Sequence, residues 1–265
     1  MDCGKLSHGI ILFADIQKSC HRYAWPADKQ ILERRVPPST SNTHKLMHSV
    51  KLHKLPSRRT AGRNLAQRLT KFSGQCDVVV LALPKGGVEV GAEIAVFLKA
   101  PFDVLLVRKI TTSGPEHAVL GAITSGGVRI LNGALIDHLH LSDLEIRAAV
   151  LEESMELCRS ERLYRGEAPS VDVADQTVIL VDDGGTPCSI IRDAIRLLRR
   201  QHAERIIFAT PATCHHAACN LRHEADEVVT LREPSKPVSV GKWLKHVPKM
   251  TDDKVCRLMM ETHAC

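Results

Sequence analysis

The amino-acid sequence predicts an α/β fold, in which an open, mostly parallel sheet is flanked by helices on both faces. Apolar runs without polar interruption recur at residues 78–83, 178–181 and 206–209. Segments with helical spacing separate these runs, which is the order of βαβ units. Aromatic residues make up only 3% of the 265 residues, so Val, Ile, Leu and Ala must fill the core. Such a core is typical of parallel strands buried on both faces.

Residues 1–56 are predicted to be a basic, disordered extension ahead of one domain at 57–265. They show no sustained hydrophobic period and contain Pro37-Pro38 followed by Ser, Thr, Asn and His. Between Arg34 and Lys71 there are ten Lys or Arg and no Asp or Glu. Such a segment could bind nucleic acid or acidic lipid. No aromatic residues interleave these charges to stack on bases, which favours a solvated linker over a nucleic-acid partner.

Cysteine usage and hydropathy indicate the compartment. The nine Cys residues are odd in number and show no CxxC spacing, and a domain of this size does not need a disulfide framework. No apolar run reaches the roughly 18 residues that cross a bilayer. We therefore expect a cytoplasmic protein with no membrane partner.

The first half of the domain alternates between helical and extended patterns. Gly74 is expected to end the first helix. Segment 111–127 is polar and glycine-rich, so a long, mobile loop is expected there. The predicted elements are, in order, helix 59–72, strand 78–83, helix 88–98, strand 102–107, loop 111–127 and strand 128–131.

The second half begins with a long helix. Ser142 and Glu145 form a capping-box pattern that opens a helix running to about Tyr164. The expected buried positions of this helix are Leu144, Val150, Leu151, Met155 and Leu157. The remaining predicted elements are strand 177–181, helix 190–198, strand 205–210, a short helix, strand 227–231 and a terminal helix from Asp252 capped by Thr251.

Ligands of open α/β sheets collect at the carboxyl ends of the strands. After the first strand come Pro84, Lys85, Gly86 and Gly87, and a helix begins at once. The glycines allow a ligand close to the backbone, the helix start offers amides and Lys85 supplies positive charge. The alternative is structural, because glycine also solves tight strand-to-helix turns.

Two further strand ends carry charge. Asp182 and Asp183 follow an aliphatic strand, where adjacent carboxylates are costly to bury. A vicinal diol or Mg²⁺ would offset that cost, although the pair could simply cap the next helix. Arg108 and Lys109 suit a polyphosphate but could equally be solvated.

A cluster of soft ligands lies at residues 214–223. If this segment is helical, His215, Cys219 and His223 share one face and could bind Zn²⁺. Structural Zn²⁺ sites usually close with four ligands, and Cys is often just a small buried residue, so metal binding here is not expected.

The chain resembles the type I phosphoribosyltransferases. Four hydrophobic residues precede Asp182, Asp183 and Gly184, as in the phosphoribosyl-diphosphate (PRPP) signature of that family. The resemblance extends to an uncharacterised bacterial-type subgroup and covers roughly Pro56 to the C-terminus. The matching stretches are Arg58-Arg59-Thr60-Ala61-Gly62-Arg63-Asn64-Leu65-Ala66, Leu83-Pro84-Lys85-Gly86-Gly87-Val88, Val107-Arg108-Lys109, Gly121-Ala122-Ile123, Gly126-Gly127-Val128-Arg129-Ile130-Leu131-Asn132, Tyr164-Arg165-Gly166, Glu224-Ala225-Asp226-Glu227-Val228-Val229 and Val240-Gly241.

This resemblance implies an enzyme that transfers the phosphoribosyl group from Mg-PRPP to an unidentified nitrogen acceptor and releases pyrophosphate. Asp182 and Asp183 would hold the ribose hydroxyls and stabilise developing positive charge. Mg²⁺ would arrive with the substrate near these acids, without a resident metal site. A homodimer is also implied. The residues implied to hold pyrophosphate are Lys85, Gly86, Gly87, Arg108 and Lys109.

The loop that should hold the 5-phosphate departs from the family pattern Asp-Asp-Gly-x-Ala-Thr-Gly-x-Thr. Pro187 replaces a Thr and removes a hydroxyl and a backbone donor, and Cys188 replaces a Gly. Ile190 replaces a hydroxyl residue, and Lys85 stands for the usual Arg. The loop residues are Gly184, Gly185, Thr186, Pro187, Cys188, Ser189 and Ile190.

Two functions compete at this stage. The retained acidic pair favours an active transferase, whereas the altered loop favours a catalytically impaired relative that binds a ribose phosphate, a nucleotide or a regulatory partner. A nicotinamide-cofactor enzyme is disfavoured, because no G-x-G-x-x-G turn follows the first strand.

Overall fold

The computed structural model describes residues 54–112, 118–237 and 239–263. They belong to a compact unit, Leu52–Cys265. Most of the predicted extension lies outside the described residues. Leu55 makes two backbone hydrogen bonds within the compact unit: its N–H donates to Trp243 O at 2.8 Å, and its carbonyl accepts from Lys245 N at 2.9 Å.

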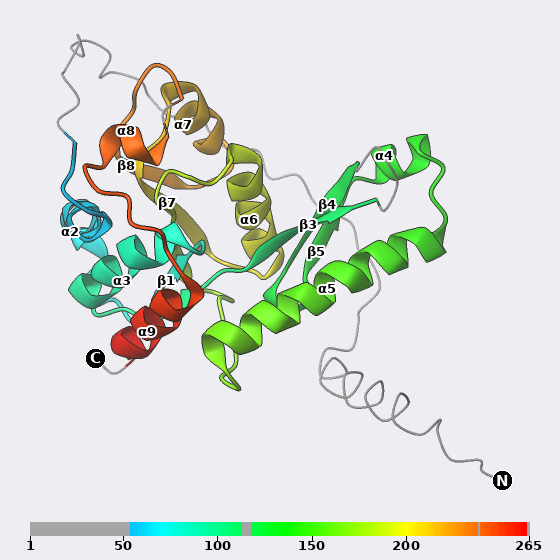
Figure 1. Cartoon of the computed structure of the whole chain (residues 1–265), viewed down its shortest axis with the longest axis horizontal. Coiled ribbons are helices and arrows are strands. Elements are labelled where there is room, and N and C mark those ends of the chain that lie inside the picture. Colours follow the sequence, from blue (N-terminus) through cyan, green and yellow to red (C-terminus); the bar gives the residue numbers. More distant parts are fainter. Residues whose placement is uncertain (1–53, 113–117, 238, 264–265) are drawn as a thin grey trace. The chain divides into compact units, whose positions relative to one another are not determined.

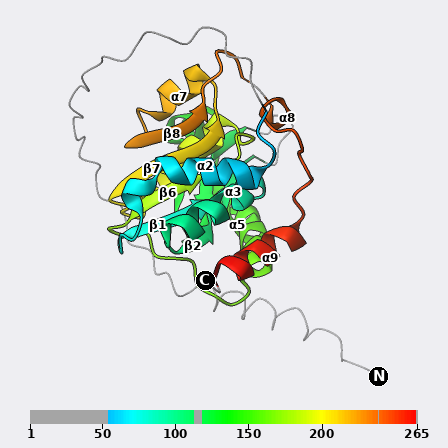
Figure 2. The same cartoon turned by 90° about the vertical axis from the view of Figure 1, so that its left-hand side faces the viewer.

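Five parallel strands form the main sheet of the compact unit (Figure 1). Their order is β2–β1–β6–β7–β8, and all five are labelled in Figure 2. In the shared register, Val80 lies opposite Phe102 on one side and Ile179 on the other. The strands are β1 (Val78–Ala82), β2 (Phe102–Val104), β6 (Thr177–Val181), β7 (Arg205–Ala212) and β8 (Glu227–Arg232). The predicted open, mostly parallel α/β sheet is confirmed.

The strands separate two hydrophobic cores, because successive side chains point to opposite faces. In β1, Val78 and Val80 lie in one core, and Val79 and Leu81 in the other. Helices α2, α3 and α9 cover the first face, which Figure 2 shows, and α6 and α7 cover the second. These helices are α2 (Arg58–Arg68), α3 (Gly86–Leu98), α6 (Cys188–Arg200), α7 (His215–Leu221) and α9 (Asp252–His263). The sheet therefore carries helices on both sides, as predicted.

A second, antiparallel sheet was not predicted. Its strands are β3 (Val107–Thr111), β4 (Val119–Thr124) and β5 (Arg129–Leu131), in the order β3–β4–β5. The single strand predicted at 102–107 was wrong, because the chain changes sheet between β2 and β3. The loop predicted at 111–127 was also wrong, since it contains β4.

Glycines explain why segment 111–127 was wrongly predicted to be a loop. A Cβ on Gly121 would lie closer than 3.0 Å to the Ile130 carbonyl oxygen, so this glycine permits close pairing of β4 with β5. Gly126 and Gly127 have φ angles of +79° and +77° and form the turn between these strands. Among the described residues of segment 111–127, this turn, Thr112 and Ala118 lie outside the strands. Residues 113–117 lie outside the described residues.

The long helix α5 (Asp143–Arg165) begins with the predicted capping box. The Ser142 N–H donates to Glu145 Oε2 at 2.8 Å, and the Glu145 N–H donates to Ser142 Oγ at 3.3 Å. The terminal helix α9 is likewise capped, since Lys254 N donates to Thr251 Oγ1 at 3.3 Å. The starts of these two helices were thus correctly predicted from local sequence, whereas α4 (Gly133–His138) and α8 (Val240–Trp243) were not predicted.

The predicted buried face of α5 was partly wrong. Leu157 is buried and Val150 is half-buried, but Leu144, Leu151 and Met155 have exposed fractions of 78%, 56% and 52%. The spacings of seven and four residues put the last three on one helix face, while Val150 and Leu157 share the opposite one. Both faces are apolar in sequence, and only one packs against described residues.

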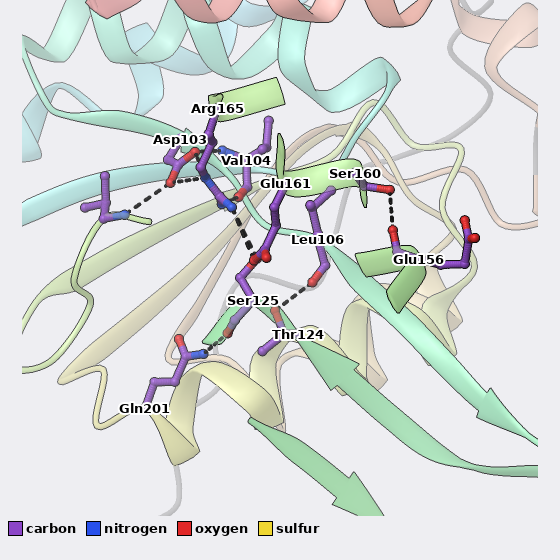
Figure 3. Close-up of polar contacts among 11 residues, drawn as sticks. Asp103, Val104, Leu106, Thr124, Ser125, Glu156, Ser160, Glu161, Arg165 and Gln201 are labelled. Carbon is purple, nitrogen blue, oxygen red and sulfur yellow. Dashed lines mark hydrogen bonds and ion pairs between the residues drawn. The ribbon is translucent and has the colours of Figure 1, made fainter. Parts of the chain in front are cut away.

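A buried ion pair anchors α5 and the second sheet to the main sheet (Figure 3). Arg165 Nε donates to both carboxylate oxygens of Asp103, at 2.8 and 2.9 Å, and the side chains are only 5% and 3% exposed. Arg165 also donates to the Val104 carbonyl and to Ser125 Oγ. Thr124 Oγ1 donates to the Leu106 carbonyl at 2.7 Å. These contacts join β2, the β4–β5 turn and the end of α5.

The remaining described helices are short. They are the α-helices α4 (Gly133–His138) and α8 (Val240–Trp243), with 3-10 turns at Thr70–Phe72 and Ser125–Gly127. None of the helices in the described ranges combines the length and the apolarity needed to cross a bilayer.

Replacing Arg165 with Met should lower the free energy of unfolding by about 3–5 kcal/mol, because Asp103 would remain buried without its counter-charge. Urea unfolding followed by circular dichroism measures this. Arg162→Met, at an exposed position of the same helix, should change stability by about 0.5 kcal/mol or less. Adding Asp103→Asn to Arg165→Met should restore part of the loss. An Arg165→Met protein as stable as wild type would contradict the anchoring role.

Candidate functional site

A cavity of about 420 Å³ opens at the carboxyl ends of β1 and β6. Its wall combines the turn after β1, the segment between β2 and β3, the loop before α6 and one face of α5. The lining residues are Leu83, Pro84, Lys85, Leu105, Leu106, Val107, Arg108, Leu157, Ser160, Tyr164, Gly185, Thr186, Pro187 and Ile190. Three of the predicted site segments therefore converge on one cavity.

Asp182 organises the loop after β6. Its Oδ1 accepts from Thr186 Oγ1 at 2.5 Å, and its Oδ2 accepts from Gly184 N at 2.7 Å and Thr186 N at 3.3 Å. The residue is only 1% exposed. The carboxylate thus holds the loop before α6 by accepting these hydrogen bonds, which is close to the predicted alternative that the acid caps the next helix.

Burial raises the pKa of Asp182 to about 6, and the neighbouring Asp183 carboxylate adds to the rise. The hydrogen bonds from Thr186 and Gly184 act in the opposite direction, because they favour the charged form. Asp182 therefore takes up a proton at a much higher pH than an ordinary carboxyl group.

Asp183 is held by a buried arginine that the sequence reasoning did not assign to the site. Arg58 Nε donates to Asp183 Oδ2 at 2.8 Å, and the side chains are 7% and 9% exposed. A second guanidinium nitrogen of Arg58 donates to the Pro248 carbonyl at 3.0 Å. Gly185 N donates to Asp183 Oδ1 at 3.0 Å. Arg58 is the first residue of the stretch 58–66 that resembles the family motif, and this resemblance was the sequence signal that could have identified it.

The two glycines of the turn after β1 are required by close packing. A Cβ on Gly86 would lie closer than 3.0 Å to both Asp183 carboxylate oxygens, and one on Gly87 would lie 2.7 Å from the Val181 carbonyl oxygen. Both contacts are with the end of β6, so this turn and the acidic pair form one unit. The structural reading of these glycines holds, and it brings the backbone beside the acids.

The basic side chains facing the cavity are each paired with an acid. Lys85 Nζ lies 2.9 Å from Asp252 Oδ2, and Asp252 also accepts from the Tyr164 hydroxyl. Arg108 Nε lies 2.5 Å from Glu153 Oε2 on α5. Both cations are therefore balanced by the protein itself.

Arg108 and Lys109 lie within β3, not at a strand end as predicted. Arg108 lines the cavity, whereas Lys109 does not and is close enough to Asp193 of α6 to help lower the pKa of that carboxyl group. Their divergence follows from the alternation of side chains along a strand. Burial nevertheless leaves the pKa of Asp193 raised.

The altered loop splits between the cavity and the core. Gly184 has a φ of +84°, which favours glycine, and Pro187 is the N-cap of α6. Cys188 packs against the second core and Ser189 is exposed. Gly185, Thr186, Pro187 and Ile190 line the cavity, so only part of the predicted phosphate loop reaches it.

Sequence reasoning missed the contribution of α5 to the cavity. Leu157, Ser160 and Tyr164 line it, because the anchored helix runs across the carboxyl edge of the sheet. Tyr164 belongs to the stretch 164–166 that resembles the family, so this resemblance could have identified it as a site residue.

The His/Cys cluster gives one short contact, with His215 Nε2 3.5 Å from Cys219 Sγ. Across residues 54–112, 118–237 and 239–263, no group of three or more His, Cys, Asp or Glu side chains is placed to hold a metal ion. For a Mg²⁺ ion that arrives with phosphates, the donor set at the acidic pair consists of hard carboxylate oxygens, which fit.

Comparison with known proteins gives the family. A model of the phosphoribosyl transferase domain matches residues 50–242. A Mycobacterium tuberculosis protein named "Putative phosphoribosyl transferase Rv0571c" is 34% identical over 203 residues, covering 77% of this chain and 46% of that protein. The crystal structure of TT1426 from Thermus thermophilus is 29% identical with a TM-score of 0.69, covering 78% of this chain and 98% of that one.

Gly86, Gly87, Asp182 and Asp183 do not line the cavity themselves, but Lys85 and Gly185, nearby in the chain, do. A parallel sheet whose carboxyl edge carries such a cavity defines an α/β protein of the ligand-binding type. This chain belongs to the phosphoribosyl transferase domain family, within the type I phosphoribosyltransferases, as the sequence motifs indicated. It spans about half the length of the curated relatives it matches.

The raised pKa of Asp182 predicts a pH effect. Unfolded Asp182 titrates near pH 3.9, so between about pH 4 and pH 6 the native state binds more protons than the unfolded state. The free energy of unfolding should therefore fall as pH rises through this window, by about 2–3 kcal/mol from this group. Urea unfolding at several pH values should show this fall in wild type and a smaller one in Asp182→Asn. Equal slopes would contradict the assignment.

Replacing Gly86 with Ala should displace the Asp183 carboxylate and destabilise the fold by about 1–3 kcal/mol, since the Cβ has no room beside a carboxylate that Arg58 holds. Gly241→Ala is the matched control, because a Cβ there meets no atom within 4 Å. Thermal or urea unfolding gives both values. Equal stabilities for the two variants would show that the turn and the acid are not in contact.

Proposed function

We propose that this protein is a phosphoribosyltransferase that uses Mg-PRPP and an unidentified nitrogen acceptor. In this reaction the anomeric C–O bond to pyrophosphate breaks and a C–N bond to the acceptor forms. Pyrophosphate leaves with the electron pair of the broken bond, and the acceptor gives up a proton to the surroundings. Membership of the family supports the proposal, and so does the cavity at the carboxyl edge of the sheet, which Lys85, Arg108 and the loop after Asp183 line.

The observation that carries the proposal is the junction of the glycine turn with the acidic pair. Gly86 lies directly against the Asp183 carboxylate, so one ligand can contact the turn and the acids together. PRPP has one group for each of these contacts, because its pyrophosphate, on the anomeric carbon, lies beside two ribose hydroxyls. Lys85 and Arg108 supply the positive charge that pyrophosphate needs.

The acids retain capacity to accept ribose hydroxyls. Each carboxylate oxygen has two lone pairs. Among contacts of described residues, Asp182 Oδ2 accepts two hydrogen bonds, whereas Asp182 Oδ1 and both Asp183 oxygens accept one each. Asp182 and Asp183 would also hold Mg²⁺ that comes with PRPP, where the ion would neutralise the leaving pyrophosphate.

The first turn of α6 is the proposed 5-phosphate site. The hydroxyl and the N–H of Thr186 both donate to Asp182, and Pro187 has no N–H. The amides of Cys188 and Ser189 are the first two of the helix. Neither donates a hydrogen bond to another described residue, so both can face an anion, as expected at a helix start. The site keeps fewer donors than the family pattern, which predicts weak binding of the phosphate.

A second candidate is a relative that binds PRPP or a nucleotide without turnover. The altered loop and the internal pairing of both cavity cations favour it. A homodimer, implied by the family resemblance, is proposed for either function.

Calorimetric titration of the wild-type protein with PRPP and Mg²⁺ tests the proposal. Binding should fall at least about tenfold in an Asp182→Asn/Asp183→Asn variant, because two ribose acceptors are lost. Asp143→Asn, an exposed acid on α5, should bind as wild type does. Urea unfolding of each variant shows whether it is folded.

The outcomes separate the candidates. Binding that depends on the acidic pair, followed by pyrophosphate release with one of a panel of nitrogen heterocycles, establishes the transferase. Binding without pyrophosphate release across the panel supports the non-catalytic relative. No binding by folded wild type overturns PRPP as the ligand.

A further inference from the structure

Lys85 in the glycine turn is engaged by the C-terminal helix. Its Nζ lies 2.9 Å from Asp252 Oδ2, although the two residues are 167 positions apart in the chain. The side chains are 44% and 39% exposed, so the pair is open to solvent and to ligands. A soluble anion can therefore reach Lys85 and compete with Asp252.

The position of Asp252 is fixed by packing. It lies in the first turn of α9, whose Val255, Leu258 and Met259 are buried in the first core. Lys254 Nζ donates to Glu89 Oε1 of α3 at 3.1 Å and ties the same turn to the helix that follows Lys85. The carboxylate is therefore held beside the glycine turn by the fold.

Tyr164 holds the second oxygen of the Asp252 carboxylate. The Tyr164 hydroxyl donates to Asp252 Oδ1 while Lys85 contacts Oδ2, so each oxygen has its own partner. Tyr164 and Lys85 both line the cavity. The two contacts also lower the pKa of Asp252, which keeps the carboxylate charged.

We infer that Asp252 sets the affinity of the pyrophosphate site, acting as an internal anion that pairs with Lys85 and that a bound pyrophosphate must displace. This inference rests on the proposed function, because it takes the turn at Lys85 as the pyrophosphate site. Asp252 is an affinity-determining residue, not a catalytic one, since its contacts are with Lys85 and Tyr164.

The effect should be modest. Breaking a partly exposed ion pair corresponds to about a two- to fivefold change in affinity. The negative charge of Asp252 also repels an incoming polyanion at short range, and salt screens this repulsion only partly within about 10 Å. Both contributions weaken pyrophosphate binding in the wild-type protein.

Calorimetric titration with magnesium pyrophosphate tests the inference on the full-length protein. Asp252→Asn keeps the shape of the side chain and should bind pyrophosphate about two- to fivefold more tightly than wild type. Asp253→Asn is the matched control: it makes the same charge change one residue further along α9, at an exposed position, and should bind as wild type does. Tyr164→Phe, which releases the carboxylate from its second partner, should shift affinity in the same direction by less.

A Lys85→Met variant separates this inference from the proposed function. Loss of pyrophosphate binding in Lys85→Met, with equal or weaker binding in Asp252→Asn, would leave the pyrophosphate site in place and overturn the role of Asp252. Equal tightening in Asp252→Asn and Asp253→Asn would also overturn it, because the effect would be one of net charge. No pyrophosphate binding by any of the folded proteins would overturn both proposals.

Discussion

The buried ion pair between Asp103 and Arg165 is the contact on which the rest of the site depends. Removing two charges from water costs free energy. Their mutual attraction offsets this cost only when the remaining donors and acceptors also form hydrogen bonds. Here the guanidinium contacts both Asp103 oxygens, the Val104 carbonyl and Ser125, while Val171 N donates to Asp103 as well. The pair holds the end of α5 against β2. Ser160 and Tyr164 lie within five residues of Arg165 on α5 and line the cavity, so the same contact positions them there.

Charge at the carboxyl edge of the sheet is balanced residue by residue. Asp183 is paired with Arg58, Lys85 with Asp252 and Arg108 with Glu153. Asp182 has no such cation among the described residues. Burial therefore raises its pKa, and the hydrogen bonds that it accepts from its own loop offset only part of that rise. The environments of the two adjacent acids therefore differ: one is held by a guanidinium, and the other is poised to take up a proton.

In the altered phosphate loop, too, hydrogen-bonding groups are used within the protein. Thr186 turns inward to Asp182, so its hydroxyl is used in folding the loop. Pro187 is the N-cap residue just before α6, and it has no N–H that could face a phosphate. Cys188 is partly buried in the second core, where a glycine would leave space. These substitutions reduce the number of groups that can face a phosphate.

The sequence by itself determined the main sheet, the capped starts of α5 and α9 and the identity of the acidic pair. Strands buried on both faces are continuous apolar runs, and capping residues such as Ser142 act within one turn, so both are encoded locally. The family motifs added the turn after β1 and the loop before α6. Only the tertiary structure decided the second sheet, the packed face of α5 and the partners of the site charges. Arg58 and Asp183 are 125 residues apart, and Lys85 and Asp252 are 167 apart. No local pattern can pair such residues, because their meeting depends on how the whole chain crosses the sheet.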